Sequence, residues 1–286
     1  MRCNHIVLFL GGQRGLVVAS VCVQAIFAML RILITAYNCE KYLMRCLASI
    51  KAQRVKDFVC YFMDDMSTDA TPDIFKAVVG TDSRFVYIGN TEKKWQGGNY
   101  DYLLRVRRIK QHAYDIDDED ICINIDADDW LPEDPHVFDR VLSYYADGNT
   151  WLTYGSFNFI DGPGTPPERL GWIMDKPIKD LRTELFTAVH LRTWKAFLWR
   201  AIKEEDLKCP NYWDNGLTIT HPQSAGDLFY MWPMIEMCGK AHYKCVSDVN
   251  YIYNTADAKY TDAARCCMRR YAAVARHKQP YAQLSR

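Results

Sequence analysis

Short apolar runs alternate with amphipathic segments between residues 31 and 125, and this alternation restricts the chain to few architectures. The apolar runs, each rich in residues that favour strands, are residues 31–36, 58–63, 84–88 and 121–125. Between the first two runs, one helix face is predicted from the spacing i, i+3, i+4 and i+7 of Leu43, Cys46, Leu47 and Ile50. Strands separated by helices of this length form right-handed βαβ units. The sequence therefore predicts an α/β fold with a mostly parallel, Rossmann-like sheet flanked by helices.

Capping residues predict where several helices begin. Asn38 is expected to cap the first helix, Thr71 to cap a second with proline at its first position, and Gly97 to open a third. In the second half of the chain, helices are predicted over residues 190–202 and 227–238. Strands are predicted there over residues 151–154 and 249–253.

Composition limits the class of protein. The 286 residues are 49% hydrophobic and 24% charged, as in globular proteins, and suffice for one large α/β domain or two domains. The 35 basic and 35 acidic residues cancel, which argues against a nucleic-acid partner. The eleven cysteines include no C-x-x-C pair, so they are interpreted as buried thiols in a reducing compartment.

The two ends of the chain differ from the part between them. Residues 15–30 contain no charge, which fits a signal or membrane anchor, an extra buried element, or an extension outside the fold. We expect an N-terminal extension over residues 1–28, a main domain over 29–260 and a basic tail over 261–286. The predicted localisation is cytoplasmic, with membrane association through the apolar run as an alternative. The basic tail is interpreted as a solvated helix, and the alternative is contact with an anionic surface.

Polar residues follow three of the predicted strands directly. They are Thr35-Ala36-Tyr37-Asn38, Asp64-Asp65-Met66-Ser67-Thr68-Asp69 and Asp126-Ala127-Asp128-Asp129. In a parallel sheet the carboxyl ends of the strands meet at one edge, where ligands bind. Neither a G-x-G-x-x-G motif nor a P-loop follows the first strand, which disfavours the corresponding nucleotide sites.

The acids after the fourth strand are candidate metal ligands. Asp126 and Asp128 are two residues apart on a predicted tight turn, and Asp129 is adjacent. Carboxylate oxygens in such an arrangement suit Mg²⁺ or Mn²⁺, which share their coordination shell with phosphate oxygens. The alternative is that Asp128 and Asp129 cap the helix predicted to begin near Pro132.

The strand-end motifs, together with Gly226-Asp227 at the head of a later helix, resemble the inverting glycosyltransferases of family 2, which have the GT-A fold. The resemblance covers about residues 30–255. Residues 190–195 and 227–234 are also similar to a subset of bacterial and viral members. The resemblance implies a sheet that binds a nucleotide-diphosphate sugar, with a UDP-sugar favoured, and a C-terminal half that binds a glycan or glycoconjugate acceptor.

The resemblance also implies roles for individual residues on the donor side. Thr35 and Tyr37 are expected to line the base pocket, and Asp65 to accept a hydrogen bond from the base. Asn99 is expected to lie along the nucleotide, and Asp126 to face the ribose or the sugar. Asp128 and Asp129 are expected to hold Mn²⁺ or Mg²⁺, without a decision as to which is the direct ligand.

On the acceptor side, Asp227 is expected to be the general base that takes a proton from the acceptor hydroxyl. Many relatives have Glu where this chain has Gly226. The alternative for Asp227 is an acid stabilised by the N-terminus of a helix. His190 and Arg192 are expected to contact the diphosphate or the acceptor, although a histidine predicted on a helix is more often structural.

Two other functions are compatible with the same acids. A metal-dependent nucleotidyltransferase would need a basic or glycine-rich phosphate loop near the first strand, and residues 35–40 are not such a loop. An inactive carbohydrate-binding protein would have no physical need for Asp65, Asp128 and Asp227 together. The sequence therefore favours the glycosyltransferase.

Overall fold

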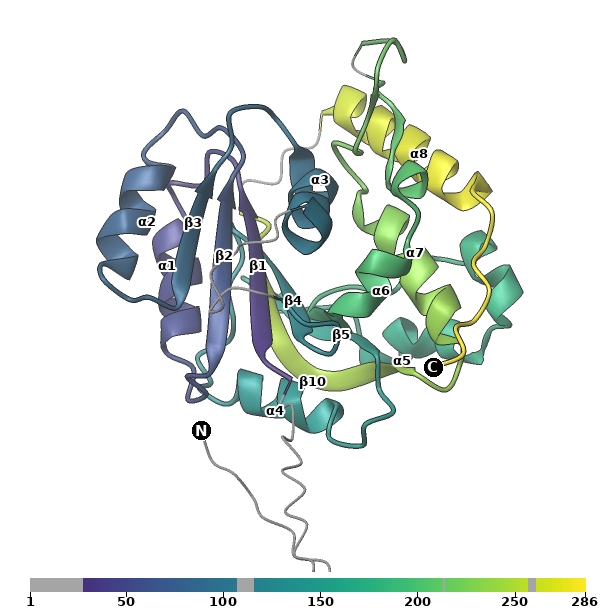
Figure 1. Cartoon of the computed structure of the whole chain (residues 1–286), viewed down its shortest axis with the longest axis horizontal. Coiled ribbons are helices and arrows are strands. Elements are labelled where there is room, and N and C mark those ends of the chain that lie inside the picture. Colours follow the sequence, from purple (N-terminus) through teal and green to yellow (C-terminus); the bar gives the residue numbers. More distant parts are fainter. Residues whose placement is uncertain (1–27, 107–115, 213, 257–260) are drawn as a thin grey trace, which may run out of the picture.

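The computed structural model describes residues 28–106, 116–212, 214–256 and 261–286 (Figure 1). Within these residues, an eight-stranded sheet has the order β10-β5-β7-β4-β1-β2-β3, with β6 paired to β5. The pairs β1–β2, β1–β4, β2–β3 and β10–β5 are parallel, whereas β7 runs antiparallel to both β4 and β5. The predicted α/β fold with a mostly parallel sheet is confirmed.

The bounds of the elements are as follows. The strands of the large sheet are β1 (Leu30–Ala36), β2 (Phe58–Asp64), β3 (Phe85–Gly89), β4 (Ile121–Asp126), β5 (Leu152–Phe159), β6 (Gly162–Pro163), β7 (Arg192–Lys195) and β10 (Tyr243–Tyr253). A separate pair comprises β8 (Cys209–Pro210) and β9 (Ile219–Thr220). The α-helices are α1 (Leu43–Lys51), α2 (Thr71–Val79), α3 (Trp95–Asp101), α4 (Val137–Tyr144), α5 (Pro167–Leu170), α6 (Ala196–Ala201), α7 (Asp227–Cys238) and α8 (Asp262–His277). Shorter turns are η1 (Tyr102–Val106), η2 (Gly171–Asp175), η3 (Ile178–Thr183) and η4 (Glu204–Leu207).

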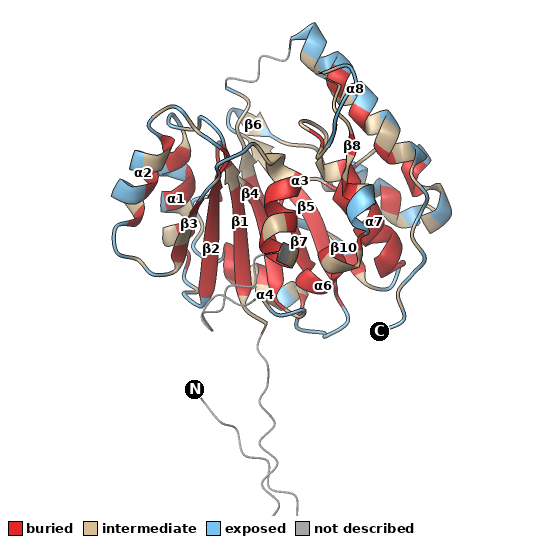
Figure 2. Ribbon diagram, turned by 45° about the horizontal axis from the view of Figure 1, so that its top comes forward, coloured by how far each residue is buried: buried red, intermediate tan, exposed pale blue. Residues whose placement is uncertain are grey.

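Side chains alternate between two hydrophobic cores, one on each face of the sheet. Along β1, Ile32 and Ile34 pack into the core formed with α1, α2 and α4, whereas Leu33 packs into the core formed with α3, α6, α7 and α8. This alternation follows from the two-residue period of a strand. Figure 2 shows the strands buried between these layers. Because both faces are covered, the strands read as continuous apolar runs in the sequence.

The loops after β1 and β2 bind each other, which corrects two predicted caps. Asn38 does not cap α1, which begins at Leu43; its backbone φ is 52°, and its Oδ1 accepts a hydrogen bond from the backbone N–H of Thr68 at 2.8 Å. Thr71 is already the first residue of α2, and its Oγ1 accepts a hydrogen bond from the Cys39 N–H at 2.8 Å. Asparagine and threonine side chains compete for backbone groups in this way, so tertiary contacts use the capping side chains between loops.

The helix predicted over residues 190–202 is wrong in its first part. Residues 192–195 form β7, and only residues 196–201 form α6. Trp194 pairs with Cys122 of β4 on one side and Leu152 of β5 on the other. Because residues 192–195 are buried on all sides, their sequence shows no hydrophobic period that distinguishes a helix from a strand. Their position between two strands decides that they form a strand. The predicted helix over residues 227–238 is confirmed as α7.

The apolar run near the N-terminus ends inside the fold. Residues 1–27 lie outside the described part of the chain, but Leu30 is fully buried in β1 and the Met29 N–H donates to Asp120 at 2.9 Å. Among the described residues, no helix has the length and apolar character needed to cross a membrane. The predicted localisation, with its alternative of membrane association through this run, is therefore corrected: the end of the run is a strand of the sheet.

The segment predicted as a basic tail packs against the rest of the molecule. Its helix α8 buries Cys267, Tyr271 and Ala275 in the core that also contains α7. After the helix, the Leu284 N–H donates to the Met237 carbonyl at 2.9 Å. The C-terminal residues thus lie beside α7 (Figure 1).

Candidate active site

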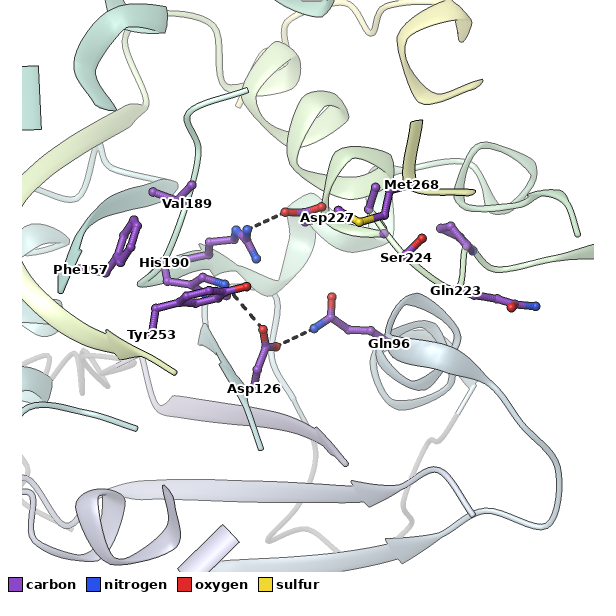
Figure 3. A pocket seen from close by; sticks show the side chains of 14 residues that line it. Gln96, Asp126, Phe157, Val189, His190, Gln223, Ser224, Asp227, Tyr253 and Met268 are labelled. Carbon is purple, nitrogen blue, oxygen red and sulfur yellow. Dashed lines mark hydrogen bonds and ion pairs between the residues drawn. The ribbon is translucent and has the colours of Figure 1, made fainter. Parts of the chain in front are cut away.

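A cavity of about 440 Å³ lies where the end of β4, the start of β7 and the N-terminus of α7 meet (Figure 3). Of the residues predicted from the sequence, it brings together Asp126, His190, Arg192 and Asp227. Its other lining residues are Gln96, Phe157, Val189, Pro222, Gln223, Ser224, Ala225, Gly226, Tyr253 and Met268. The cavity therefore combines residues that are up to 172 positions apart in the chain, from Gln96 to Met268.

Asp126 is the last residue of β4, and its carboxylate is held from three directions. Gln96 Nε2 donates to Oδ1 at 2.8 Å and Asn124 Nδ2 donates to the same atom at 3.2 Å. His190 Nε2 lies 3.6 Å from Oδ2. Burial raises the pKa of Asp126, and the charge of Asp128 raises it further. Negative charge at this position is therefore incompletely compensated by the surrounding protein.

Asp129, Asp126 and His190 form a group that could hold a metal ion, because their ligand atoms all lie within 4.8 Å of one another. Asp129 is 2% exposed and accepts hydrogen bonds from the Tyr251 hydroxyl and the Asn254 N–H, both at 2.7 Å. Burial raises its pKa, and the neighbouring aspartates add to this effect. A cation would relieve the repulsion between these carboxylates.

His190 lies two residues before β7, and not on the helix that the sequence predicts there. Its ring stacks on that of Tyr251, with the centroids 4.4 Å apart and the planes at 8°. Among the described residues, its buried Nδ1 has no hydrogen-bond partner. Burial lowers its pKa well below the usual value, and the charge of Arg192 acts in the same direction. The imidazole is thus neutral at physiological pH, which is the form that ligates metals.

Asp227 begins α7 and is paired with Arg192 of β7. Arg192 Nη2 donates to Asp227 Oδ2 at 2.6 Å, while Nε donates to the Ala188 carbonyl at 2.9 Å and Nη1 to Asn124 Oδ1 at 3.3 Å. The guanidinium is 4% exposed, so these contacts fix it in place. Arg192 therefore acts on the pocket by holding Asp227, a relationship that the sequence did not indicate.

Asp65 and Asn99, which are predicted to contact the nucleotide, hold the segment before α3. Asp65 is 2% exposed, and its carboxylate accepts hydrogen bonds from the Lys94 and Trp95 N–H groups at 2.8 and 2.9 Å. Asn90 Nδ2 donates to both Asp65 and Asn99, at 2.7 and 2.8 Å. Asn99 also donates to the Trp95 carbonyl at 2.9 Å. These two side chains thus fix the position of α3 and with it Gln96.

The remaining predicted residues lie at the carboxyl edge outside the cavity lining. Thr35 is opposite Asp126 in the pairing of β1 with β4. Tyr37 is 51% exposed, and the Lys93 ammonium lies 2.8 Å from the centroid of its ring. Asp128 is exposed, unlike its buried neighbour Asp129.

Several residues of the cavity were not identified from the sequence. Gln96 is the most central, because it donates to Asp126 and its Oε1 accepts from the Tyr230 hydroxyl of α7 at 3.3 Å. Its position directly before Gly97 was the only available signal. Tyr253 and Met268 come from a strand and a helix whose cavity-facing side chains no sequence pattern distinguishes.

The family model described as Glycosyl transferase family 2 matches residues 31–205. The Escherichia coli protein WfaP, named as a UDP-Glc:alpha-D-GlcNAc-diphosphoundecaprenol beta-1,3-glucosyltransferase, is 29% identical over 141 residues, which are 49% of this chain and 53% of WfaP. Glycosyltransferase GlyA of Streptococcus pneumoniae is 29% identical over 146 residues, which are 46% of this chain and 17% of GlyA. The chain thus matches about half or less of the length of these curated relatives.

Solved structures show the same fold. TarS of S. aureus in complex with UDP-GlcNAc has a TM-score of 0.57 at 15% identity, covering 86% of this chain and 66% of TarS. The mannosyltransferase PcManGT of Pyrobaculum calidifontis, in complex with GDP-Man and Mn²⁺, has a TM-score of 0.56 at 16% identity, covering 88% of this chain and 65% of PcManGT. The predicted GT-A fold is confirmed by these similarities. Because the family model matches more than half of the sequence and the fold agrees, the chain belongs to glycosyl transferase family 2.

Proposed function

We propose that this protein transfers a sugar, with inversion and with the help of a divalent metal ion, from a nucleotide-diphosphate sugar to a hydroxyl group of a glycan or glycoconjugate. The observation that carries the proposal is the single cavity that has Asp126 on one side and Asp227 on another (Figure 3). The donor class is supported by the nucleotide sugars bound to TarS and PcManGT. A UDP-sugar is favoured because TarS and WfaP are both described with one.

Asp126, Asp129 and His190, with the exposed Asp128 next to them, would hold Mn²⁺ or Mg²⁺. The residues fit such an ion, because the raised pKa values of Asp126 and Asp129 mark uncompensated negative charge and the His190 ring is neutral. When bound, the ion neutralises charge on the departing diphosphate. This donor set resembles the acid-rich sites that hard cations prefer.

Asp227 would be the general base. It takes the proton of the acceptor hydroxyl while the oxygen forms a bond with the anomeric carbon. On the opposite face of the sugar, the bond between that carbon and the diphosphate oxygen breaks, and the diphosphate leaves with the electron pair. Arg192 contributes by fixing the direction of the carboxylate through the 2.6 Å contact. Inversion follows because attack and departure take place on opposite faces of the carbon.

The predicted nucleotide contacts divide into two kinds. Thr35 and Tyr37 lie at the edge of the sheet and are proposed to line the base pocket. Asp65 and Asn99 are proposed to act indirectly, because their side chains are occupied in holding the segment from Asn90 to Trp95. Little of the Asp65 carboxylate is exposed to accept the direct hydrogen bond from the base that the resemblance implies.

A donor panel tests the proposal. The full chain is incubated with UDP- and GDP-sugars in Mn²⁺ or Mg²⁺, without and with glycoside acceptors, and release of the nucleoside diphosphate is measured. We expect release from at least one donor, stimulated by acceptor and abolished by chelator. Product from the best pair is then examined by NMR, where the anomeric coupling shows whether configuration is inverted. Release of sugar 1-phosphate instead, which requires cleavage between the two phosphates of the donor, would indicate a nucleotidyltransferase and contradict the proposal.

A further inference from the structure

Helix α8 contributes one side chain, Met268, to the lining of the active-site cavity. The helix is anchored through Cys267 and Tyr271, which are buried. Because successive residues of an α-helix are about 100° apart, Arg265 and Arg269 lie on the edge of α8 beyond Met268, on the side away from the buried face. Both arginines are exposed, as are the first turns of α8 in Figure 2. Two exposed cationic side chains thus follow Met268 around the helix, with Arg265 about 60° from it and Arg269 about 100° from it toward the solvent.

These two arginines differ from Arg200 and Arg276 in their contacts. Arg276 donates to the carbonyl groups of Arg182 and Glu184, and Arg200 pairs with Asp118. By contrast, neither Arg265 nor Arg269 forms an ion pair or side-chain hydrogen bond within the part of the chain that the structure describes. The sequence after Asp262 contains no acid up to its end. The charge of this edge is therefore available to a ligand.

The cavity itself has the opposite character. Its charged walls are the carboxylates of Asp126 and Asp227 and the guanidinium of Arg192, which is paired with Asp227, so that one carboxylate is in excess. Its apolar walls include the rings of Phe157 and Tyr253. Aromatic rings of this kind pack against the apolar face of a sugar ring. An anionic group of the acceptor would find the Arg192 guanidinium already paired with Asp227, whereas the two arginines outside the cavity are unpaired within the part of the chain that the structure describes. The arrangement suits a ligand whose sugar enters the cavity while an anionic group stays at α8.

We propose that the acceptor is a sugar linked to a phosphate or phosphodiester group, and that Arg265 and Arg269 bind this group while a sugar hydroxyl reaches Asp227. This inference rests on the proposed function, which supplies the acceptor site. Arginine is suited to the role because its planar guanidinium offers paired donors that match phosphate oxygens. The acceptor class is thereby narrowed from glycans in general to phosphate-bearing glycans or glycoconjugates.

The test compares two forms of the same acceptor probe, a set of octyl hexopyranosides and the matching hexose 1-(octyl phosphate) diesters. Equilibrium binding of each form to the full chain is measured by titration calorimetry, and transfer is measured with the best donor. We expect the phosphodiester form to bind more tightly. In Arg265→Gln/Arg269→Gln, the preference for the phosphodiester should fall about tenfold, as expected for two exposed charge-assisted contacts. Raising the salt concentration should reduce the preference of the wild type more than that of the variant.

Arg270→Gln is the matched control, because this arginine lies on the other edge of α8, with its guanidinium 5.7 Å from the ring of Tyr212. It should keep the wild-type preference. Equal binding of the two probe forms by the wild type, or an equal loss of preference in the control, would overturn the proposal. Binding to phosphatidylglycerol vesicles that depends on Arg265 and Arg269, without preference for the soluble phosphodiester, would also overturn it in favour of a membrane surface. Because binding is measured without donor, failure of the proposed transfer reaction is detected separately.

Discussion

Arg192 on β7 and Asp227 at the start of α7 form an ion pair in which Nη2 lies 2.6 Å from Oδ2. The two residues are 35 positions apart, and the pair joins the central sheet to the helix that borders the cavity. Arg192 is buried and held by two further acceptors, whereas the Asp227 side chain is 23% exposed. The pair therefore presents a carboxylate of fixed direction to a partly open cavity, the geometry required of a general base.

Asp227→Asn should lower transfer by about 10²–10⁴-fold, the usual contribution of a general base. The loss should appear in kcat, because the substitution keeps the shape and removes only the basic carboxylate. Donor affinity, measured by nucleotide titration, should stay within a few-fold. If Asp227 were only a helix-terminal acid, its loss would cost under about 1 kcal/mol of stability and leave turnover intact.

A double-mutant cycle checks how Arg192 acts. If it works through Asp227, Arg192→Gln should add little to the kinetic defect of Asp227→Asn, because the two changes remove the same unit. Fully additive defects would show that Arg192 contacts substrate independently. Stability of each variant is measured beside activity, since removing a buried charged partner also affects folding.

His190→Gln should raise the Mn²⁺ concentration needed for half-maximal transfer by about tenfold or more, as expected when a metal site loses part of its shell. Excess chelator should abolish transfer by the wild type, and added Mn²⁺ should restore it. His242→Gln is the matched control, because His242 stacks on Trp151 and does not line the cavity. Full activity in chelator would contradict the metal requirement.

Gly98→Ala should be more harmful than Gly97→Ala. A Cβ at Gly98 would lie 2.8 Å from His221 Nδ1, whereas one at Gly97 would lie 3.4 Å from His221 Cδ2, an ordinary contact. Both substitutions favour the helix by about 1 kcal/mol, so the difference in unfolding free energy between the two variants reports the effect of the clash. We expect Gly98→Ala to be about 1–3 kcal/mol less stable than Gly97→Ala in chemical denaturation. Transfer should also fall, because His221 directly precedes residues 222–226, which form one wall of the cavity.

The contribution of His221 to folding stability should fall when the pH is lowered from about 7 to about 5, whereas the raised pKa values of Asp126 and Asp129 act in the opposite direction. Burial lowers the pKa of this histidine. Below its unfolded value of about 6.5, the unfolded chain therefore binds a proton that the folded chain does not, which favours unfolding. In His221→Gln, lowering the pH from about 7 to about 5 should therefore be less destabilising than in the wild type. His190, whose pKa is also lowered, accounts for part of the remaining dependence. An unchanged pH dependence in the variant would show that His221 does not contribute.

A chain beginning at Met29 should fold and bind nucleotide, because the first contacts of the sheet begin there. The Met29 carbonyl accepts a hydrogen bond from the Ile121 N–H at 3.0 Å. A chain beginning at Ile32 is the control, since it also lacks Leu30 and the buried ion pair of Arg31 with Asp120. Unfolding midpoints of both are compared with that of the full chain. If the chain beginning at Met29 is insoluble while the full chain is soluble, residues 1–28 belong to the folded unit.

The amino-acid sequence was sufficient to predict the parallel part of the sheet and the edge at which the acids gather. The strands β1, β2 and β4 are buried on both faces, so they appear in the sequence as mainly apolar runs, whereas the edge strand β3 is partly exposed. Strand direction then places Thr35, Asp65 and Asp126 at the same edge. The helix beginning at Asp227 was also predicted, from its length and its acidic first residue.

Only the tertiary structure decided what each polar side chain does at that edge. The Asp65 carboxylate accepts hydrogen bonds from the N–H groups of Lys94 and Trp95. The Asp227 carboxylate, at the start of α7, is paired with Arg192 of β7. The strand β7 and the approach of α8 likewise depend on neighbours that are distant in the chain. The burial pattern and the backbone preference of a segment can be read from the local sequence, because both depend on residues that are close together in the chain. A hydrogen-bond partner is chosen among all groups that folding brings within about 3 Å, so it becomes determined only when the layers have packed.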